Sequence, residues 1–317
     1  MRLRGIDFGP VLGASGVQGF FGEGYQFHKY LRPFGLDFAG CTFVAKTTTL
    51  WPRLDNMPMR KDQITPKEFK PKCIKVNLTQ GHILNSVGLS GPGAKALLEM
   101  NRWQQRTKPF LLSFMSVAKD KPSRLQELDQ FCVLLKNHLV GFQTRIGLQI
   151  NFSCPNVGLN PAELVNEISY ALDLAASHLN IPLIPKINVE FPAQAALKIS
   201  QHRVCDALCI SNTIPWGHLG NQINWERLFG TKISPLAHLG GGGLSGKPLF
   251  RLVTNWIYQA RYLGMTIPIN AGGGILGPDD LTWLQTAGAD SIFLGSIASL
   301  RPWRVQKTIE RAHMLFR

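Results

Sequence analysis

The stretch IPINAGGGILGPDDLTWLQTAGADSIFLGS, residues 267–296, contains two short apolar runs separated by an amphipathic segment. The segment begins near Pro278, has Asp279 and Asp280 in its first turn, and stops at Gly288, which are typical helix start and stop signals. The two apolar runs, 267–274 and 291–296, have the length and composition of buried strands. This stretch therefore predicts a parallel strand–helix–strand unit.

Outward from this unit, the same alternation continues along the whole chain. Apolar runs expected as strands number eight, at residues 9–15, 41–46, 109–116, 146–153, 181–188, 206–212, 267–274 and 291–296. Eight such units favour a closed α/β barrel of the TIM type, (β/α)₈, with an open doubly wound sheet as the alternative. Residues 47–92 and 214–241 interrupt the rhythm and are expected as loop insertions at one end of the barrel.

Size and composition fit one domain covering residues 1–317. Hydrophobic residues make up 44% and charged residues 17% of the 317 residues, as in globular proteins. No apolar run reaches the roughly 18 residues of a membrane helix, and the amino terminus has no secretory h-region, so a cytoplasmic protein is expected.

The formal charge is +14, but the basic residues are dispersed and accompany no nucleic-acid-binding motif. We therefore expect no nucleic-acid partner. The six cysteines lack the spacing of a zinc site or a disulfide framework, so no metal is expected and single cysteines are read as core residues unless their surroundings say otherwise.

Polar and glycine-rich clusters recur where the predicted strands end. These are 14–16, Lys46-Thr47, 151–156, Lys186, Asn212-Thr213, 272–274 and Gly295-Ser296, with a further run, GGGGLSGKP, from Gly240. In a barrel the carboxyl ends of the strands share one rim, which carries the active site. Glycines in neighbouring loops expose backbone N–H groups that can bind a phosphate, although each cluster alone has a purely structural explanation.

Two kinds of reactive side chain stand out. Lys186 lies in an otherwise apolar strand, where its ammonium either meets an anionic partner or extends to solvent, and Lys46 allows the same two interpretations. Cys154 follows a strand and is flanked by Asn151 and Asn156, so its thiol is a candidate base at the rim.

Several motifs together resemble the class 1 dihydroorotate dehydrogenases. INFSCPN from Ile150 is similar to the SCPN motif of that family, GGLSGKP from Gly242 to its signature after the sixth strand, and NSVGLSGPG from Asn85 to its substrate-facing segment. AGGGI from Ala271 and AGADSIFLGS from Ala287 resemble its paired flavin-phosphate motifs. The match runs in order from about residue 5 to 300, with Val87 where the family typically has methionine.

The resemblance implies FMN at the rim. The resemblance implies that the flavin is contacted by Ala14, Gly16, Lys46, Thr47, Asn151, Lys186 and Asn212. It implies that the phosphate is bound by Gly243, Gly273, Gly274, Gly295 and Ser296. Gly242 and Gly272 are implied as further contacts of the cofactor. The implied substrate contacts are Lys46, Asn85, Gly88, Leu89, Asn151, Asn156, Asn212 and Thr213.

The implied reaction is oxidation of dihydroorotate to orotate in pyrimidine biosynthesis. Cys154 would remove the C5 proton while the C6 hydride passes to flavin N5. The resemblance favours a homodimer and leaves the electron acceptor open among fumarate, a quinone, and NAD through an electron-transfer partner protein. A neutral dihydropyrimidine as substrate and a non-redox barrel that binds phosphate ligands are the alternatives.

Overall fold

The computed structural model describes residues 1–152 and 161–316. A curved parallel sheet forms most of a barrel, in the order β3-β13-β12-β9-β8-β7-β6. Its strands are β3 (Val11–Gly13), β6 (Phe110–Phe114), β7 (Ile146–Asn151), β8 (Leu183–Ile187), β9 (Leu208–Ile210), β12 (Ile269–Ala271) and β13 (Ser291–Leu294).

Residues 42–48 close this sheet into a ring. They form isolated parallel bridges to Leu12 on one side and to Leu111 and Phe114 on the other. Ladder hydrogen bonds such as Gly13 N–H to Thr42 O, 2.9 Å, and Ala45 N–H to Leu111 O, 2.9 Å, bind both edges. The closed barrel is therefore confirmed and the open sheet is excluded, although the predicted strand at 41–46 takes part through bridges rather than as a regular strand.

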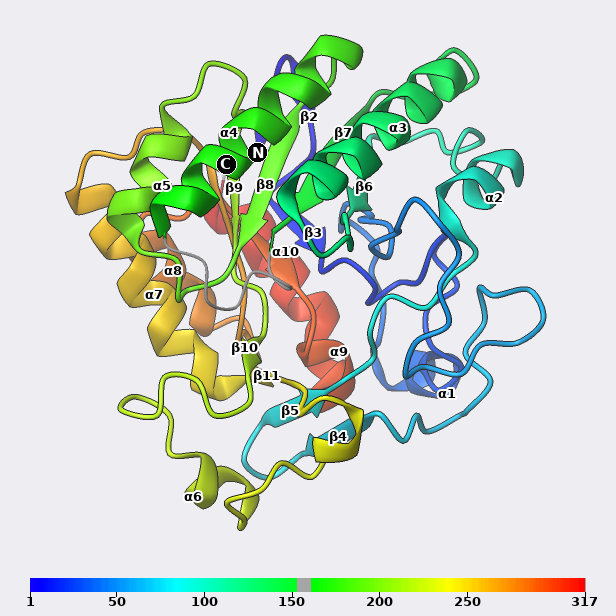
Figure 1. Cartoon of the computed structure of the whole chain (residues 1–317). Coiled ribbons are helices and arrows are strands. Elements are labelled where there is room, and N and C mark those ends of the chain that lie inside the picture. The colour runs from blue at the N-terminus through cyan, green and yellow to red at the C-terminus, as the bar shows by residue number, and fades with distance from the viewer. Residues whose placement is uncertain (153–160, 317) are drawn as a thin grey trace.

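Helices surround the ring, as Figure 1 shows. In chain order they are α1 (His28–Leu31), α2 (Gly93–Glu99), α3 (Lys121–Leu139), α4 (Pro161–His178), α5 (Ala193–Ser200), α6 (Trp225–Phe229), α7 (Lys247–Tyr262), α8 (Asp280–Ala287), α9 (Ile297–Leu300) and α10 (Val305–Leu315), with 3₁₀ turns η1 (Arg32–Phe34), η2 (Ala237–Leu239) and η3 (Pro302–Arg304). Neighbours pack in sequence, α3 on α4, α4 on α5, α5 on α7 and α7 on α8.

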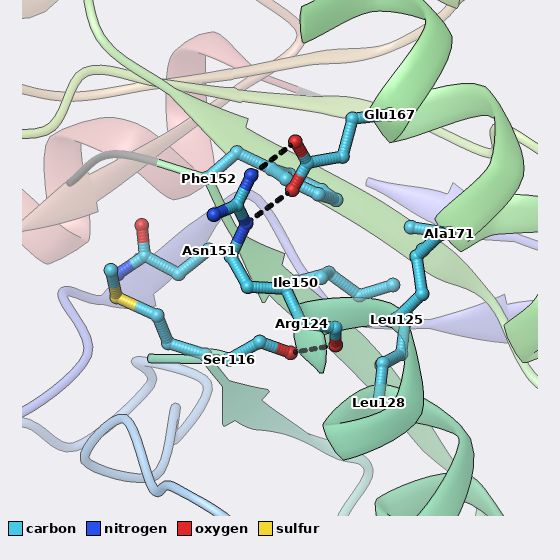
Figure 2. Close-up of a pocket in the computed structure, with 10 residues that line it drawn as sticks. Ser116, Arg124, Leu125, Leu128, Ile150, Asn151, Phe152, Glu167 and Ala171 are labelled. Atoms are coloured by element: carbon cyan, nitrogen blue, oxygen red, sulfur yellow. Dashed lines mark hydrogen bonds and ion pairs between the residues drawn. The ribbon is translucent and has the colours of Figure 1, made fainter. Parts of the chain in front are cut away.

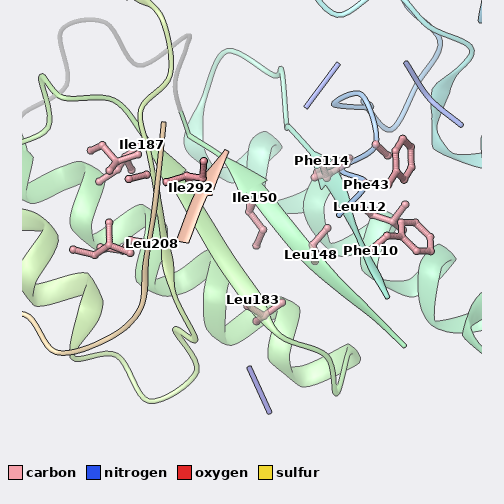
Figure 3. Packing of buried hydrophobic residues seen from close by; sticks show 14 of the residues in the cluster. Phe43, Phe110, Leu112, Phe114, Leu148, Ile150, Leu183, Ile187, Leu208 and Ile292 are labelled. Atoms are coloured by element: carbon pink, nitrogen blue, oxygen red, sulfur yellow. The ribbon is translucent and has the colours of Figure 1, made fainter. Parts of the chain in front are cut away.

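The alternation of side chains along each strand creates two apolar layers. Outward-facing residues such as Leu148, Leu183 and Leu208 pack under the helices (Figure 3). Inward-facing residues fill the barrel and include Leu12, Val44, Leu111, Ile184, Cys209 and Phe293. Each fully buried Leu or Phe stabilises the fold by about 1.5–3 kcal/mol, so this double layer fixes the strand ends on which the site is built.

Parts of the two insertions, with residues 243–246 just after the second, form an antiparallel sheet near the carboxyl ends of the barrel strands, in the lower part of Figure 1. Its strands are β10 (Ile214–Pro215), β11 (Gly243–Gly246), β5 (His82–Asn85) and β4 (Ile74–Asn77), in that order. A two-stranded hairpin, β1 (Arg2–Leu3) and β2 (Ile6–Asp7), contributes Leu3 and Ile6 to the inner layer. The insertions lie at one end and consist mostly of loops, as predicted, and their short strands β4, β5 and β10 join this sheet.

Helix α7 begins without a side-chain cap. Ser245 lies within β11, and Gly246 with φ of 99° precedes α7. Ser245 is held in the strand because β11 pairs with β5, with Ser245 opposite Ile83.

Candidate active site

Adjacent strands bring Asn151, Lys186 and Asn212 together at the carboxyl-end rim. Asn151 at the end of β7 is the register partner of Lys186 on β8. Asn212, two residues after β9, donates from Nδ2 to Oδ1 of Asn151 at 2.8 Å. Three side chains predicted to act together therefore lie on one face of the barrel.

Lys186 points into the barrel and is 6% exposed. Its Nζ lies 3.5 Å from Ser15 Oγ and 5.4 Å from the centre of the Phe293 ring. Across residues 1–152 and 161–316, no carboxylate pairs with this ammonium, and burial lowers the pKa of Lys186. The solvent-extended alternative is therefore wrong for Lys186, and a charged ammonium at this place would be stabilised by an anionic group beside it.

Lys46 is half-buried at the neighbouring edge of the rim. Its Nζ donates to the carbonyl of Ser90 at 2.7 Å and lies 4.8 Å from the centre of the Phe20 ring. Burial lowers the pKa of Lys46 to about 8, while the charges of Asp55 and Glu23 act in the opposite direction. Lys46 therefore loses its proton more readily than an exposed lysine.

Thr47 and Gly16 complete this edge. The Thr47 hydroxyl lies 3.1 Å from Ser15 Oγ and 2.9 Å from Ser113 Oγ. Gly16 has φ of 93°, and a side chain there would stand 3.7 Å from Lys46 Cγ. The loop after β3 thus lies against both lysines through Ser15 and Gly16.

The predicted substrate segment, residues 85–89, follows β5. Asn85 Nδ2 donates to the Gly243 carbonyl at 3.3 Å, and Leu89 N–H donates to Asp55 Oδ2 at 3.0 Å. A Cβ on Gly243 would lie 2.2 Å from Thr213 Oγ1, so glycine is required for this approach. The second sheet thereby brings Asn85, in the first insertion, close to Thr213, Gly242 and Gly243, which flank the second insertion.

The remaining predicted phosphate loops lie beside one another. Gly272 N–H donates to Ile210 O at 2.6 Å, and Ala14 N–H donates to Leu294 O at 2.8 Å, which joins the ends of four strands. Gly273 and Gly274 have φ of 119° and 87°, and a Cβ on Gly274 would lie 2.7 Å from the backbone nitrogen of Phe250 in α7. Gly295 and Ser296 connect β13 to α9. The missing side chains of Gly272, Gly273 and Gly274 allow this loop to approach Phe293 and α7 closely.

Cys154 and Asn156 lie outside the described residues. The last described residue before them, Phe152, donates from its backbone nitrogen to Lys186 O at 3.0 Å.

A buried ion pair beside Asn151 was not predicted. Arg124 on α3 binds Glu167 on α4 through Nε–Oε1, 2.6 Å, and Nη2–Oε2, 2.7 Å, next to a small cavity lined by Asn151, Phe152 and Ser116 (Figure 2). The sequence did contain a sign that Arg124 is buried. It has the same helical spacing as Leu128, Phe131 and Leu135, which places a charged residue on an apolar face of the helix.

Four of the cysteines, Cys73, Cys132, Cys205 and Cys209, are buried core residues as expected, and burial raises the pKa of each thiol. In the part of the chain that the structure describes, no His, Cys, Asp and Glu side chains cluster as metal ligands. Within the same residues, no helix is both long and apolar enough to cross a membrane.

Comparison with known proteins gives a consistent result. The family model described as dihydroorotate dehydrogenase matches residues 3–313. A catalytic subunit of dihydroorotate dehydrogenase B (NAD(+)) from Listeria monocytogenes serovar 1/2a is 28% identical over 312 residues, covering 95% of this chain and 87% of the relative. The corresponding subunit from Desulforudis audaxviator is 27% identical over 303 residues, covering 92% of this chain and 84% of its own.

A similar structure supports the fold. The crystal structure of a ligand-free DHODH from Eimeria tenella superposes with a TM-score of 0.67 at 19% identity, covering 100% of this chain and 86% of that chain. At this identity the likeness establishes the shared barrel architecture.

Proposed function

The chain belongs to the dihydroorotate dehydrogenase family, and from this premise we propose that it oxidises dihydroorotate to orotate with FMN, a step of pyrimidine biosynthesis. The family consists of oxidoreductases that act on CH–CH bonds. The observation that carries the proposal is the meeting of Asn151, Lys186 and Asn212 with the glycine loops on one rim.

The residues of the rim fit FMN. Lys186 is a buried cation without a carboxylate partner among the described residues, and a flavin gains negative charge near N1 and O2 on reduction. The left-handed Gly273 and Gly274 let the loop after β12 pack closely against α7, and backbone N–H groups of such a loop are suitable phosphate ligands. We assign Gly242, Gly243, Gly272, Gly273, Gly274, Gly295 and Ser296 to the phosphate end, and Ala14, Gly16, Lys46, Thr47, Asn151, Lys186 and Asn212 to the ring end.

The chain's own residues would bind and deprotonate the substrate. Amide groups of Asn85, Asn151, Asn156 and Asn212 match the C=O and N–H groups of a pyrimidine-dione, and Lys46 matches its carboxylate. Cys154 is the proposed base for the C5 proton, while the C6 hydrogen leaves with its bonding electron pair. FMN supplies the two-electron acceptor for that hydrogen.

The relatives named as catalytic subunits favour an assembly with an electron-transfer protein. We propose that this chain, as one catalytic domain, likewise passes electrons to a partner, and that it acts as a homodimer in the cytoplasm. Mixing the purified chain with candidate acceptors, namely fumarate, a quinone, and NAD with a flavoprotein partner, identifies the acceptor by which one reoxidises the reduced protein.

The central test is spectroscopic. The purified protein is expected to absorb near about 450 nm from bound FMN and to lose this band when dihydroorotate is added without oxygen. A protein that binds no FMN when reconstituted with it would support the non-redox alternative. Bleaching by dihydrouracil but not by dihydroorotate would refute the proposed substrate and favour a neutral dihydropyrimidine.

A further inference from the structure

A carboxylate of the chain itself lies against the proposed substrate segment. Asp55 Oδ2 accepts the backbone N–H of Leu89 at 3.0 Å and lies 3.3 Å from Arg53 Nη2. Its Oδ1 accepts the backbone N–H of Asn56 at 3.0 Å. The Asp55 side chain is 22% exposed, so solvent only partly screens its charge.

Backbone pairing holds Asp55 in this place. Arg53 and Gly91 exchange hydrogen bonds of 2.9 and 3.0 Å, and Met57 N–H donates to Val87 O at 3.1 Å. Between these points, Asp55 N–H donates to Ser90 Oγ at 3.1 Å. Residues 53–57 therefore run along residues 87–91, with the Asp55 carboxylate directed at the substrate segment.

Gly88 makes the close approach possible. Its φ is 71°, and a Cβ on it would lie 2.1 Å from Asp55 Cγ. Any side chain at position 88 would therefore displace the carboxylate. The Asp55 carboxylate can therefore pack against residue 88 only because that residue is glycine.

The contact between Asp55 and Leu89 places a negative charge where a ligand would bind the segment. Leu89 can bind a polar ligand only through its backbone groups, and its N–H already donates to the Asp55 carboxylate. Lys46, which bonds the carbonyl of the next residue, Ser90, brings a cation to the same segment. A substrate carboxylate drawn to Lys46 would meet the like charge of Asp55 and compete for the same N–H.

We propose that Asp55 is a specificity-determining residue that weakens binding of anionic pyrimidines at this segment relative to neutral ones. The inference rests on the proposed function because it takes residues 85–89 as the substrate segment. A purely structural Asp55 would instead support the loop for every ligand alike.

The experiment compares an anionic with a neutral ligand. Kd values of the FMN-loaded enzyme are measured for orotate and for uracil from the perturbation of flavin absorbance, in the wild type and in Asp55→Asn. We expect orotate to bind about five- to tenfold more tightly in the variant, while the Kd of uracil changes less than about twofold. The orotate gain should shrink in high salt, because it originates from charge repulsion.

Asp62→Asn is the matched control. Asp62 also accepts backbone N–H groups, those of Ile64 and Thr65, but within its own turn, so the ratio of the two Kd values should not change. The inference would be overturned if Asp55→Asn raised the Kd of orotate and of uracil equally, or left the ratio of the two Kd values unchanged. Absence of flavin reduction by dihydroorotate in the wild type would refute the proposed function alone, since the ratio of Kd values is measured without turnover.

Discussion

Arg124 and Glu167 are bound to each other by two hydrogen bonds inside the protein, 43 residues apart in sequence. Arg124 Nη1 also donates to the carbonyl of Lys119 at 2.7 Å, so the guanidinium joins the loop after β6 to both α3 and α4. Because Glu167 lies near the start of α4, which follows residues 153–160, the pair anchors the helix next to the segment that contains Cys154.

The first prediction concerns this pair. Glu167→Ala should lower the free energy of unfolding by about 3–5 kcal/mol, because it leaves a buried guanidinium without its counter-charge. Urea unfolding of both proteins measures the difference. Glu99→Ala, which removes the exposed Lys95–Glu99 pair, should change stability by less than about 1 kcal/mol. If Glu167→Ala also lowered the free energy of unfolding by less than about 1 kcal/mol, the Arg124–Glu167 pair would not be what anchors α4.

A second prediction separates backbone strain from collision. Gly274 and Gly264 have similar φ values, 87° and 91°, but a Cβ on Gly274 meets backbone atoms at 2.7 and 2.8 Å, whereas nothing lies within 4 Å of one on Gly264. Both alanine variants incur left-handed strain of about 1–2 kcal/mol. Gly274→Ala should be less stable than Gly264→Ala by a further 1–3 kcal/mol, roughly the cost of overpacking, and should bind FMN less tightly. Thermal unfolding and FMN titration test this, and equal stability would contradict it.

The barrel was predictable because its strands are apolar runs that end in glycine or polar residues. Lys186 and Asn151 could be placed at one rim because parallel strands end on the same side, whatever the details of the loops. The second sheet was not predictable, since β10 has only two residues and pairs with β11, which in turn pairs with β5 from the other insertion. Such strands are specified by their partners rather than by their own periodicity.

The same reason explains the missed side chains. Asp55 lies in an irregular segment and gains its role from pairing with residues 87–91, a contact without a local sequence signal. Arg124 and Glu167 are charged helix residues, which are usually exposed, and only their register with apolar neighbours marks them as buried.

Lys186 leads to a prediction about the flavin. Lys186→Gln should retain FMN but shift its two-electron midpoint potential about 30–60 mV more negative, since roughly 30 mV corresponds to each tenfold loss in preference for the reduced form. Equilibration with reference dyes measures the potential. Lys198→Gln, on the outer helix α5, should leave it unchanged. An unaltered potential in Lys186→Gln would separate this lysine from the flavin.

Cys154 is predicted to determine the rate of flavin reduction. Cys154→Ala should keep the FMN spectrum while dihydroorotate reduces it on the order of 10² to 10⁴ times more slowly, with Cys154→Ser in between, because a hydroxyl is a poorer base. Anaerobic stopped-flow absorbance measures the rate. Cys41→Ala is the control, since burial raises the pKa of that thiol and keeps it protonated near neutral pH. Undiminished reduction in Cys154→Ala would remove the thiol from the mechanism.

The last prediction follows from the pKa of Lys46, which burial lowers to about 8. Below this pH the ammonium is charged and attracts a carboxylate, and above it the charge is lost, so the Kd of orotate should rise as pH increases through 8. A charged hydrogen bond contributes about 1.5–3 kcal/mol, so the rise should reach about tenfold between roughly pH 7 and 9.5. Uracil should show no such step while it remains neutral, and Lys46→Gln should abolish the step for orotate. Because the charge of Asp55 raises the pKa of Lys46, Asp55→Asn should move the midpoint of the step to lower pH, whereas a fixed midpoint would mean that the two side chains do not interact.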